Sequence, residues 1–132
     1  MGLAAWLDDT DALAALDSAH ASAWNATDAA LLGLCRDRVA VMLGHTPTLE
    51  AMSSDLLRSL SGWTSSDAFS EVERAALDFT EQYIIDVASM SNVQAVRLRE
   101  HLGDEGLVTF VNALLVIEQR MSLELALAGV FR

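Results

Sequence analysis

Apolar residues recur at intervals of three and four along most of this chain, which is the spacing of one face of an α-helix. The pattern predicts a first helix over about 10–24 and a second helix that ends near Leu43. Gly44 then stands where a residue in the left-handed conformation commonly ends a helix. The first third of the chain is therefore expected to form two helices joined by a short turn.

A break in the pattern follows at His45-Thr46-Pro47-Thr48. Proline disfavours the helical conformation in the residue before it, so we expect Pro47 to keep Thr46 outside any helix. Thr48 is then placed to cap a short helix that runs to about Leu60.

Two capping boxes predict helix starts in the second half of the chain. In Ser-x-x-Glu at 70–73 and Ser-x-x-Gln at 91–94, two side chains satisfy backbone N–H groups in the first turn of a helix. We expect the first of these helices to end near Met90 and the second near Leu102, followed by a last helix over about 104–128.

The last of these segments is apolar on nearly every side. A helix of this kind lies at the centre of a fold or is shared with another subunit, and assembly into an oligomer would cover it. Hairpin signals are missing from the sequence. We therefore predict an all-α bundle of about six helices, formed by a single domain over 1–132, that assembles into a homo-oligomer.

Composition and charge restrict the partners. Of the 132 residues 52% are hydrophobic, and 19 acidic residues face 8 basic ones, which gives a formal net charge of −11. Because nucleic acids and anionic membranes attract clustered basic residues, neither is an expected partner. The apolar stretch 107–127 also carries Glu118 and Arg120, which are costly in a lipid core.

The single cysteine, Cys35, allows no internal disulfide and no cysteine-based zinc site. We expect a soluble cytoplasmic protein.

One stretch of the chain resembles a known family. Residues 63–81 read Trp-Thr-Ser-Ser-Asp-Ala-Phe-Ser-Glu-Val-Glu-Arg-Ala-Ala-Leu-Asp-Phe-Thr-Glu, with Arg38-Val39-Ala40 before them and Gln119-Arg120 after them. These residues resemble the shared segment of the carboxymuconolactone decarboxylase and alkylhydroperoxidase-D superfamily, and the resemblance extends over about 30–125. It implies an alkylhydroperoxidase-D-like helical fold that assembles into dimers, trimers or hexamers, with active sites near the subunit contacts.

The peroxidase branch of that superfamily carries a Cys-x-x-Cys pair at a helix N-terminus, where the thiol pKa is lowered. Aligned on Gly44 and the arginine motif before it, the resemblance places His45 at the first cysteine and Thr48 at the second. Gly33 and Met52 fall at the positions of the relay glutamate and the relay histidine. Without two sulfurs the dithiol cycle cannot run in its familiar form. The resemblance therefore indicates the family but not its peroxidase activity.

His45 is the candidate catalytic residue because it lies in this turn, and Glu50 is its candidate carboxylate partner. Thr48 is a candidate binding residue. Each has a structural alternative: His45 as a loop histidine in solvent, Thr48 as a helix cap, and Glu50 as a first-turn acid that stabilises its helix.

Glu81 and Arg120 are the other candidate binding residues, since polar groups on apolar helices must be paired or functional. Two roles are open for these residues. Either both side chains form the polar wall of a pocket for a small acid, or Arg120 forms an internal ion pair with Glu81 or Glu118. For Cys35 we expect burial among apolar neighbours instead of reactivity.

The sequence leaves three functions open, and whether the chain is an enzyme is one of the open points. The first is a carboxymuconolactone decarboxylase-like protein that lacks the dithiol and binds a small organic molecule near His45. The second is a diverged decarboxylase or isomerase in which His45, with Glu50 or Glu81, acts on a lactone or carboxylic acid. The third is a protein-binding scaffold or a residual peroxidase. No cofactor or metal ion is indicated, since His20 and His101 lack partners at metal-ligand spacing.

Overall fold

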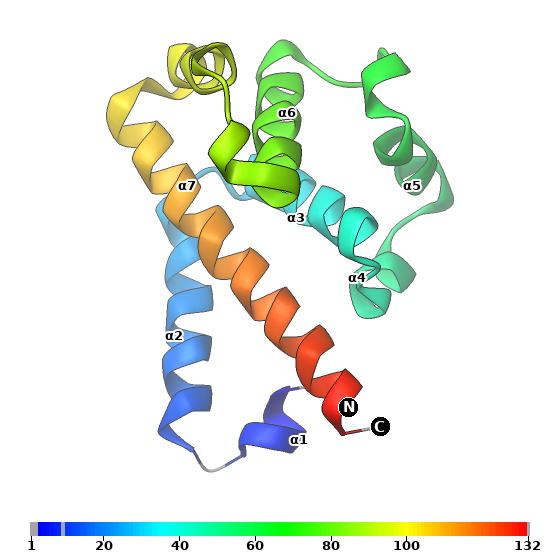
Figure 1. Cartoon of the computed structure of the whole chain (residues 1–132), viewed down its shortest axis with the longest axis vertical. Helices are drawn as coiled ribbons and strands as arrows, with labels where there is room; N and C mark the ends of the chain where they lie inside the picture. The colour runs from blue at the N-terminus through cyan, green and yellow to red at the C-terminus, as the bar shows by residue number, and fades with distance from the viewer. Residues whose placement is uncertain (1–2, 9, 132) are drawn as a thin grey trace.

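A computed structural model describes residues 3–8 and 10–131 of the chain. This part of the chain is helical and contains no strand, which confirms the predicted all-α class. It forms seven α-helices and two short 3₁₀ helices (Figure 1). In chain order these are α1 (Leu3–Leu7), α2 (Asp11–Ala26), α3 (Ala29–Leu43), α4 (Thr46–Ala51), α5 (Ser54–Ser61), η1 (Trp63–Ser65), α6 (Glu71–Asp86), η2 (Val87–Ser89) and α7 (Asn92–Val130).

α7 is the longest element, and its part after Gly103 runs diagonally across the molecule (Figure 1). It packs against α2, α3 and α6, and the main core fills the space between these four helices. Phe110 and Leu114 of α7 are fully buried there, together with Leu32 of α3. The apolar sides of α7 are thus covered mainly by other helices of the same chain, while Val108 remains exposed. None of the helices in the described part of the chain is long and apolar enough to cross a membrane.

Most helices begin where side-chain caps predict. The two capping boxes form as expected, since Ser70 pairs reciprocally with Glu73 and Ser91 with Gln94. Asp28 caps α3 by accepting from two backbone N–H groups. Because each such cap contributes about 1 kcal/mol, these residues fix the helix starts locally.

The turn region ahead of α5 differs from the prediction. Thr46 and Pro47 lie inside α4, because the first turn of a helix tolerates a proline, whose missing N–H would have no partner there. Thr48 is consequently an internal residue of α4 and not a helix cap. The cap that does form belongs to Ser53, whose hydroxyl accepts from the backbone N–H of Leu56. The expected single helix is therefore two short helices, α4 and α5.

The predicted boundary between the last two helices is confirmed as a break in α7 at Gly103. Gly103 has a φ of 77°, and helix continues on both sides of it. Glycine adopts this left-handed conformation readily because it has no Cβ. α6 also ends earlier than expected, at Asp86, and η2 leads from there into the turn before α7.

Candidate functional site

His45 lies in the turn between α3 and α4, where the backbone holds it in place. Gly44 has a φ of 73°, which ends α3 and redirects the chain. The N–H groups of Gly44 and His45 both donate to the carbonyl of Ala40, at 2.8 and 3.0 Å. The turn faces the C-terminal half of α7 (Figure 1). His45 is 6% exposed, so the alternative of a loop histidine in solvent is wrong.

Both ring nitrogens of His45 are hydrogen-bonded. Nδ1 lies 2.8 Å from Oγ1 of Thr48, three residues ahead in α4. Nε2 lies 2.6 Å from Oε2 of Glu124, which α7 contributes from 79 positions away in the sequence. Because a buried polar group without a partner is costly, these two bonds explain how the imidazole is accommodated. A hydroxyl, an imidazole and a carboxylate thus form one line of hydrogen bonds.

The donors and acceptors in this line follow from the chemistry of the groups. An ionised carboxylate only accepts hydrogen bonds, so Nε2 of His45 carries the proton shared with Glu124. In the neutral imidazole Nδ1 is then an acceptor, and the hydroxyl of Thr48 donates to it. His45 can therefore take up a proton at Nδ1 while Glu124 holds the ring. This is the arrangement of a general base with an orienting carboxylate.

Arg120 lies one helical turn before Glu124 and connects the site to α2. Its Nη2 donates to Oδ1 of Asp17 at 2.9 Å, and its Nε lies 3.7 Å from Oε1 of Glu124. Its Nη1 is buried and has no hydrogen-bond partner among the residues that the structure describes. A buried donor without an acceptor costs about 1–3 kcal/mol, so a ligand oxygen at this nitrogen would be stabilising.

His20 supplies a second unpaired nitrogen. The indole N–H of Trp24 donates to Nε2 of His20 at 3.0 Å, so that nitrogen carries no proton. Burial, and after it the positive charge of Arg120, lower the pKa of His20 below its usual 6.5. The neutral ring therefore has its proton on Nδ1. This nitrogen is buried without a partner within residues 3–8 and 10–131.

These side chains surround one cavity of about 210 Å³ between α2, α3, α4 and α7. This volume is below the range of about 300–1,000 Å³ typical of sites for drug-sized ligands, so the cavity fits only a small molecule. Arg36 completes its polar wall, with its guanidinium 5.1 Å from the centre of the Trp24 ring and bonded to Asp37. The polar lining consists of His20, Arg36, His45, Thr48, Arg120 and Glu124.

Glu50 and Glu81, the two acids selected from the sequence, lie outside this cavity. Glu50 is exposed on α4 and does not belong to the described lining of this cavity. Oε2 of Glu81 accepts from the indole N–H of Trp63 at 2.8 Å and from Nη2 of Arg38 at 3.2 Å. Glu81 therefore joins α6 to η1 and α3, in a cluster separate from His45.

The expected pairing of Arg120 with Glu81 or Glu118 is wrong. Arg120 pairs instead with Asp17 and Glu124. Glu118 is two residues from Arg120, and residues two apart on a helix do not face each other. Glu124 is four residues away and therefore lies on the same face of α7.

Cys35 is a core residue, as expected. Cys35 lies on α3 and is fully buried, and burial raises the pKa of its thiol to about 12. A thiol of this kind holds almost no thiolate at neutral pH and is a poor nucleophile. Among the described residues no group of three or more His, Cys, Asp or Glu side chains has a geometry that could hold a metal ion.

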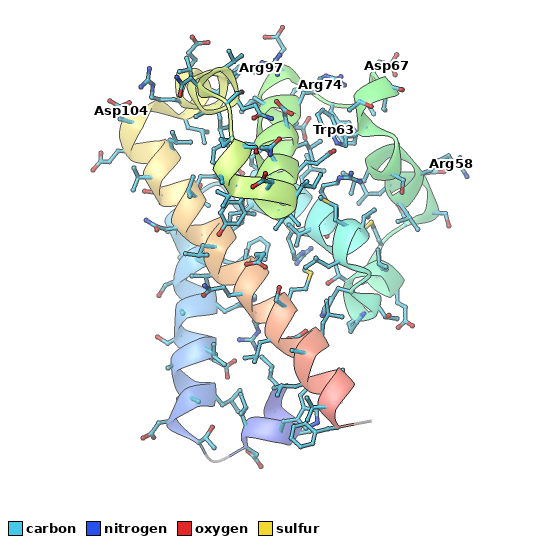
Figure 2. All side chains as sticks on the ribbon, in the orientation of Figure 1. Arg58, Trp63, Asp67, Arg74, Arg97 and Asp104 are labelled. Atoms are coloured by element: carbon cyan, nitrogen blue, oxygen red, sulfur yellow. The ribbon has the colours of Figure 1, made fainter. Side chains whose placement is uncertain are left out.

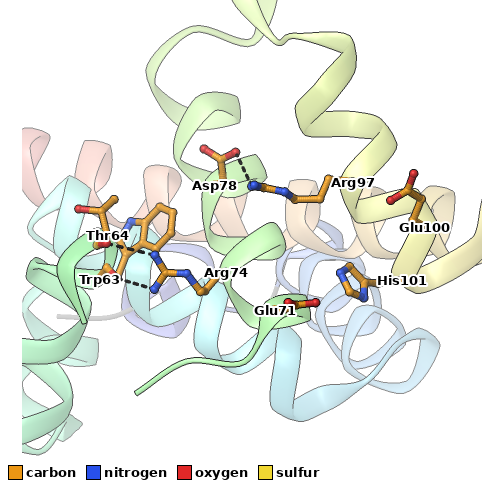
Figure 3. Close-up of a pocket in the computed structure, with 8 residues that line it drawn as sticks. All are labelled: Trp63, Thr64, Glu71, Arg74, Asp78, Arg97, Glu100 and His101. Carbon is orange, nitrogen blue, oxygen red and sulfur yellow. Dashed lines mark hydrogen bonds and ion pairs between the residues drawn. The ribbon is translucent and has the colours of Figure 1, made fainter. Parts of the chain in front are cut away.

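A larger cavity of about 680 Å³ lies where Figure 2 labels Trp63, Arg74 and Arg97. Its wall is built around Trp63, Arg74 and Arg97 (Figure 3). Arg74 donates to three backbone carbonyls in and just after η1, and Arg97 lies 3.8 Å from Asp78. The two cations are thus engaged, and neither has a buried nitrogen without a partner in the described part of the chain, whereas Arg120 in the His45 cavity does.

Glu124, Asp17 and His20 belong to the site, but sequence reasoning did not select them as site residues. The spacing of four between Arg120 and Glu124 was a local signal, since it places both on one helix face. Comparison with known proteins adds no relative, because no protein-family model, curated protein or solved structure matches the chain. The function must therefore be argued from the geometry of the site.

Proposed function

We propose that the cavity beside His45 binds a small organic acid or its lactone, and that His45 acts there as a general acid and base. The observation that carries this proposal is the buried imidazole held between the Thr48 hydroxyl and the Glu124 carboxylate, at 2.8 and 2.6 Å. A base oriented in this way accelerates proton transfer by about 10²–10⁴-fold. The Thr48 hydroxyl, which donates to Nδ1, passes the proton between the ligand and the ring.

Two unpaired donors support an acid as the ligand. Nη1 of Arg120 and Nδ1 of His20 belong to residues that line the cavity, and neither has an acceptor in the described part of the chain. A ligand carboxylate supplies acceptors for both, and its bond to the guanidinium is charge-assisted and therefore strong. In this arrangement the acid is anchored at Arg120, and its reacting carbon faces the hydroxyl of Thr48.

The same proposal includes the family. The resemblance over 63–81 supports membership of the carboxymuconolactone decarboxylase and alkylhydroperoxidase-D superfamily, in a form that has exchanged the two thiols for His45 and Thr48. Cys35 gives no support to peroxidase chemistry, because its thiol is buried in the core. A homo-oligomer remains part of the proposal because the resemblance implies one.

A thermal-shift screen with short mono- and dicarboxylic acids and their lactones tests the binding. A ligand at 100 times its Kd stabilises the folded chain by about 2.7 kcal/mol. For a chain of this size, that corresponds to a rise in Tm of about 10 °C. Arg120→Gln should abolish the shift, and Arg99→Gln should not, because Arg99 lies outside the site with an exposed partner, Asp104. The proposal fails if no acid stabilises the protein, or if Arg120→Gln is stabilised as much as the unmodified chain.

The acid and base role has its own readout. An acid found in the screen is incubated with the protein in D₂O, and exchange of its carbon-bound protons is followed by NMR. We expect exchange to be at least about 100-fold slower with His45→Gln, since the base is lost. The same variant should still bind the acid through Arg120. Equal exchange rates with and without His45 would leave a binding site but no acid and base catalyst.

A further inference from the structure

Thr48, His45 and Glu124 form hydrogen bonds in the order of a nucleophile, a base and an orienting acid. Oγ1 of Thr48 lies 2.8 Å from Nδ1 of His45, and Nε2 of the same ring lies 2.6 Å from Oε2 of Glu124. A hydroxyl is a weak nucleophile unless an adjacent base takes its proton, and a third group must orient that base. These three side chains line one cavity, so they meet both requirements.

We propose that Thr48 is a nucleophile that opens the lactone, or cleaves the simple ester, of a small organic acid through an acyl-threonine intermediate. This inference rests on the proposed function, because it uses the same cavity and the same base. It adds a covalent step that neither ligand binding nor simple proton transfer requires.

The reaction balances with residues of the site and one water molecule. The oxygen of Thr48 attacks the carbonyl carbon, and its proton moves to Nδ1 of His45. The bond from the carbonyl carbon to the leaving oxygen then breaks, and that oxygen takes the proton from His45; in a lactone it remains attached as a hydroxyl. Water next attacks the acyl carbon, gives one proton to His45, and the Thr48 oxygen leaves with that proton. The products are a carboxylic acid and an alcohol.

The negative charge that develops on the carbonyl oxygen requires nearby donors. Arg120 and His20 both line the cavity, and their Nη1 and Nδ1 atoms are buried without a partner in the part of the chain that the structure describes. The carboxylate product would bind to the same guanidinium. The same donors therefore suit the carbonyl oxygen of the ester at the start of the reaction and the carboxylate of the product at its end.

The position of Thr48 also agrees with a reactive hydroxyl. A threonine that served only to start α4 would bond to a backbone N–H, but the N-cap residue of this helix is His45, and the Thr48 hydroxyl bonds to its ring. Thr48 is half-buried and also lines a second cavity, of about 310 Å³, together with Pro47 and Met52. Its side chain is thus within reach of a ligand from two sides.

Acyl transfer from p-nitrophenyl acetate tests this inference. We expect a burst of nitrophenolate of up to one per chain, and mass spectrometry after acid quenching should find one acetyl group on Thr48. Thr48→Val keeps the shape of the side chain and should lose both the burst and the adduct, whereas Thr48→Ser should keep them. His45→Gln should slow acylation by at least about 100-fold, and Glu124→Gln should slow it as well, because each affects the base.

Thr46→Val is the matched control, since Thr46 is exposed on the same helix and should react like the unmodified chain. The inference is overturned if no burst occurs, if Thr48→Val keeps the burst, or if the acetyl group is found on another residue. The thermal-shift screen with small acids separates this failure from failure of the proposed function. Stabilisation by an acid without acylation refutes the nucleophile alone, whereas the absence of both refutes both proposals.

Discussion

Substitution of Glu81 tests whether this carboxylate, the last residue of the 63–81 segment, has a structural role. Its side chain is 29% exposed and pairs with Arg38, whose side chain is 14% exposed. Glu81→Ala removes the counter-ion of Arg38 and also the acceptor of the Trp63 indole N–H. Glu81→Gln keeps the shape and one acceptor oxygen but removes the charge.

The expected loss of stability follows from these two bonds. Removing one partner of a buried ion pair costs about 3–5 kcal/mol, and a hydrogen bond to a charged group contributes about 1.5–3 kcal/mol. Because Glu81 is only partly buried, we take the lower end of the first range, about 3 kcal/mol, for Glu81→Ala. For Glu81→Gln we expect about 1–2 kcal/mol, since the indole N–H keeps an acceptor. For a chain of this length these losses lower Tm by about 10 °C and about 5 °C.

Denaturation with guanidinium chloride measures both variants, with Glu50→Gln as the matched control. Glu50 is exposed, so its substitution should change the free energy of unfolding by less than about 0.5 kcal/mol. A double-mutant cycle of Glu81→Ala with Trp63→Phe should give a coupling energy of about 1 kcal/mol, because the two residues share a hydrogen bond. A structural role for Glu81 is refuted if Glu81→Gln leaves stability unchanged but abolishes binding of the acids tested above.

Two further predictions concern titratable groups. Because burial raises the pKa of Cys35 to about 12, its thiol should react with iodoacetamide at about pH 8 only after unfolding, and equal rates for the native and unfolded chain would contradict this. The pKa of His20 is lowered in the folded chain, so below pH 6.5 the unfolded chain binds a proton at this ring more tightly than the folded chain does. The free energy of unfolding should therefore decrease as the pH falls through this range. Unfolding measured from about pH 5 to 7 should show a weaker pH dependence for His20→Gln, and identical slopes would show that burial does not perturb this ring.

Local signals along the chain predicted most of the helices. The capping boxes and the glycine at position 44 act between residues at most four apart, so the sequence displays them directly. The main error arose at Pro47, because a proline fits the first turn of a helix as well as a break. At Gly103 the predicted boundary coincides with backbone angles that are not helical, which a glycine adopts readily.

The site was predicted only in part because its decisive contact is long-range. Thr48 lies three residues from His45, and the sequence identified both. Glu124 lies 79 positions away, and several acids of α7 were equal candidates by sequence. Which of them reaches His45 depends on how α7 is rotated against α2, α3 and α6, and that rotation is set by the packing of the whole core.

Four of the residues on which the sequence resemblance rests form a structural unit of their own, whereas Arg120, which also carries it, lines the His45 cavity. The guanidinium of Arg74 lies 5.5 Å from the centre of the Trp63 ring and donates to backbone carbonyls around η1. Glu81 then connects Trp63 to Arg38 on α3. Together these contacts attach η1 to α6 and α3. None of these four side chains belongs to the described lining of the His45 cavity.

The unit around Trp63 and the turn at 45–48 are separate parts of the structure. The unit around Trp63 maintains the packing of α3 and α6, whatever chemistry the turn at 45–48 performs. Side chains in that turn can therefore be exchanged without disturbing the unit, because the two are held by different hydrogen bonds. The contacts of this unit concern the packing of the fold, while evidence about the reaction must come from His45, Thr48 and Glu124. Their direct contacts favour proton transfer and acyl transfer over thiol chemistry, since a hydroxyl bonded to an imidazole is available there and the single thiol is buried elsewhere.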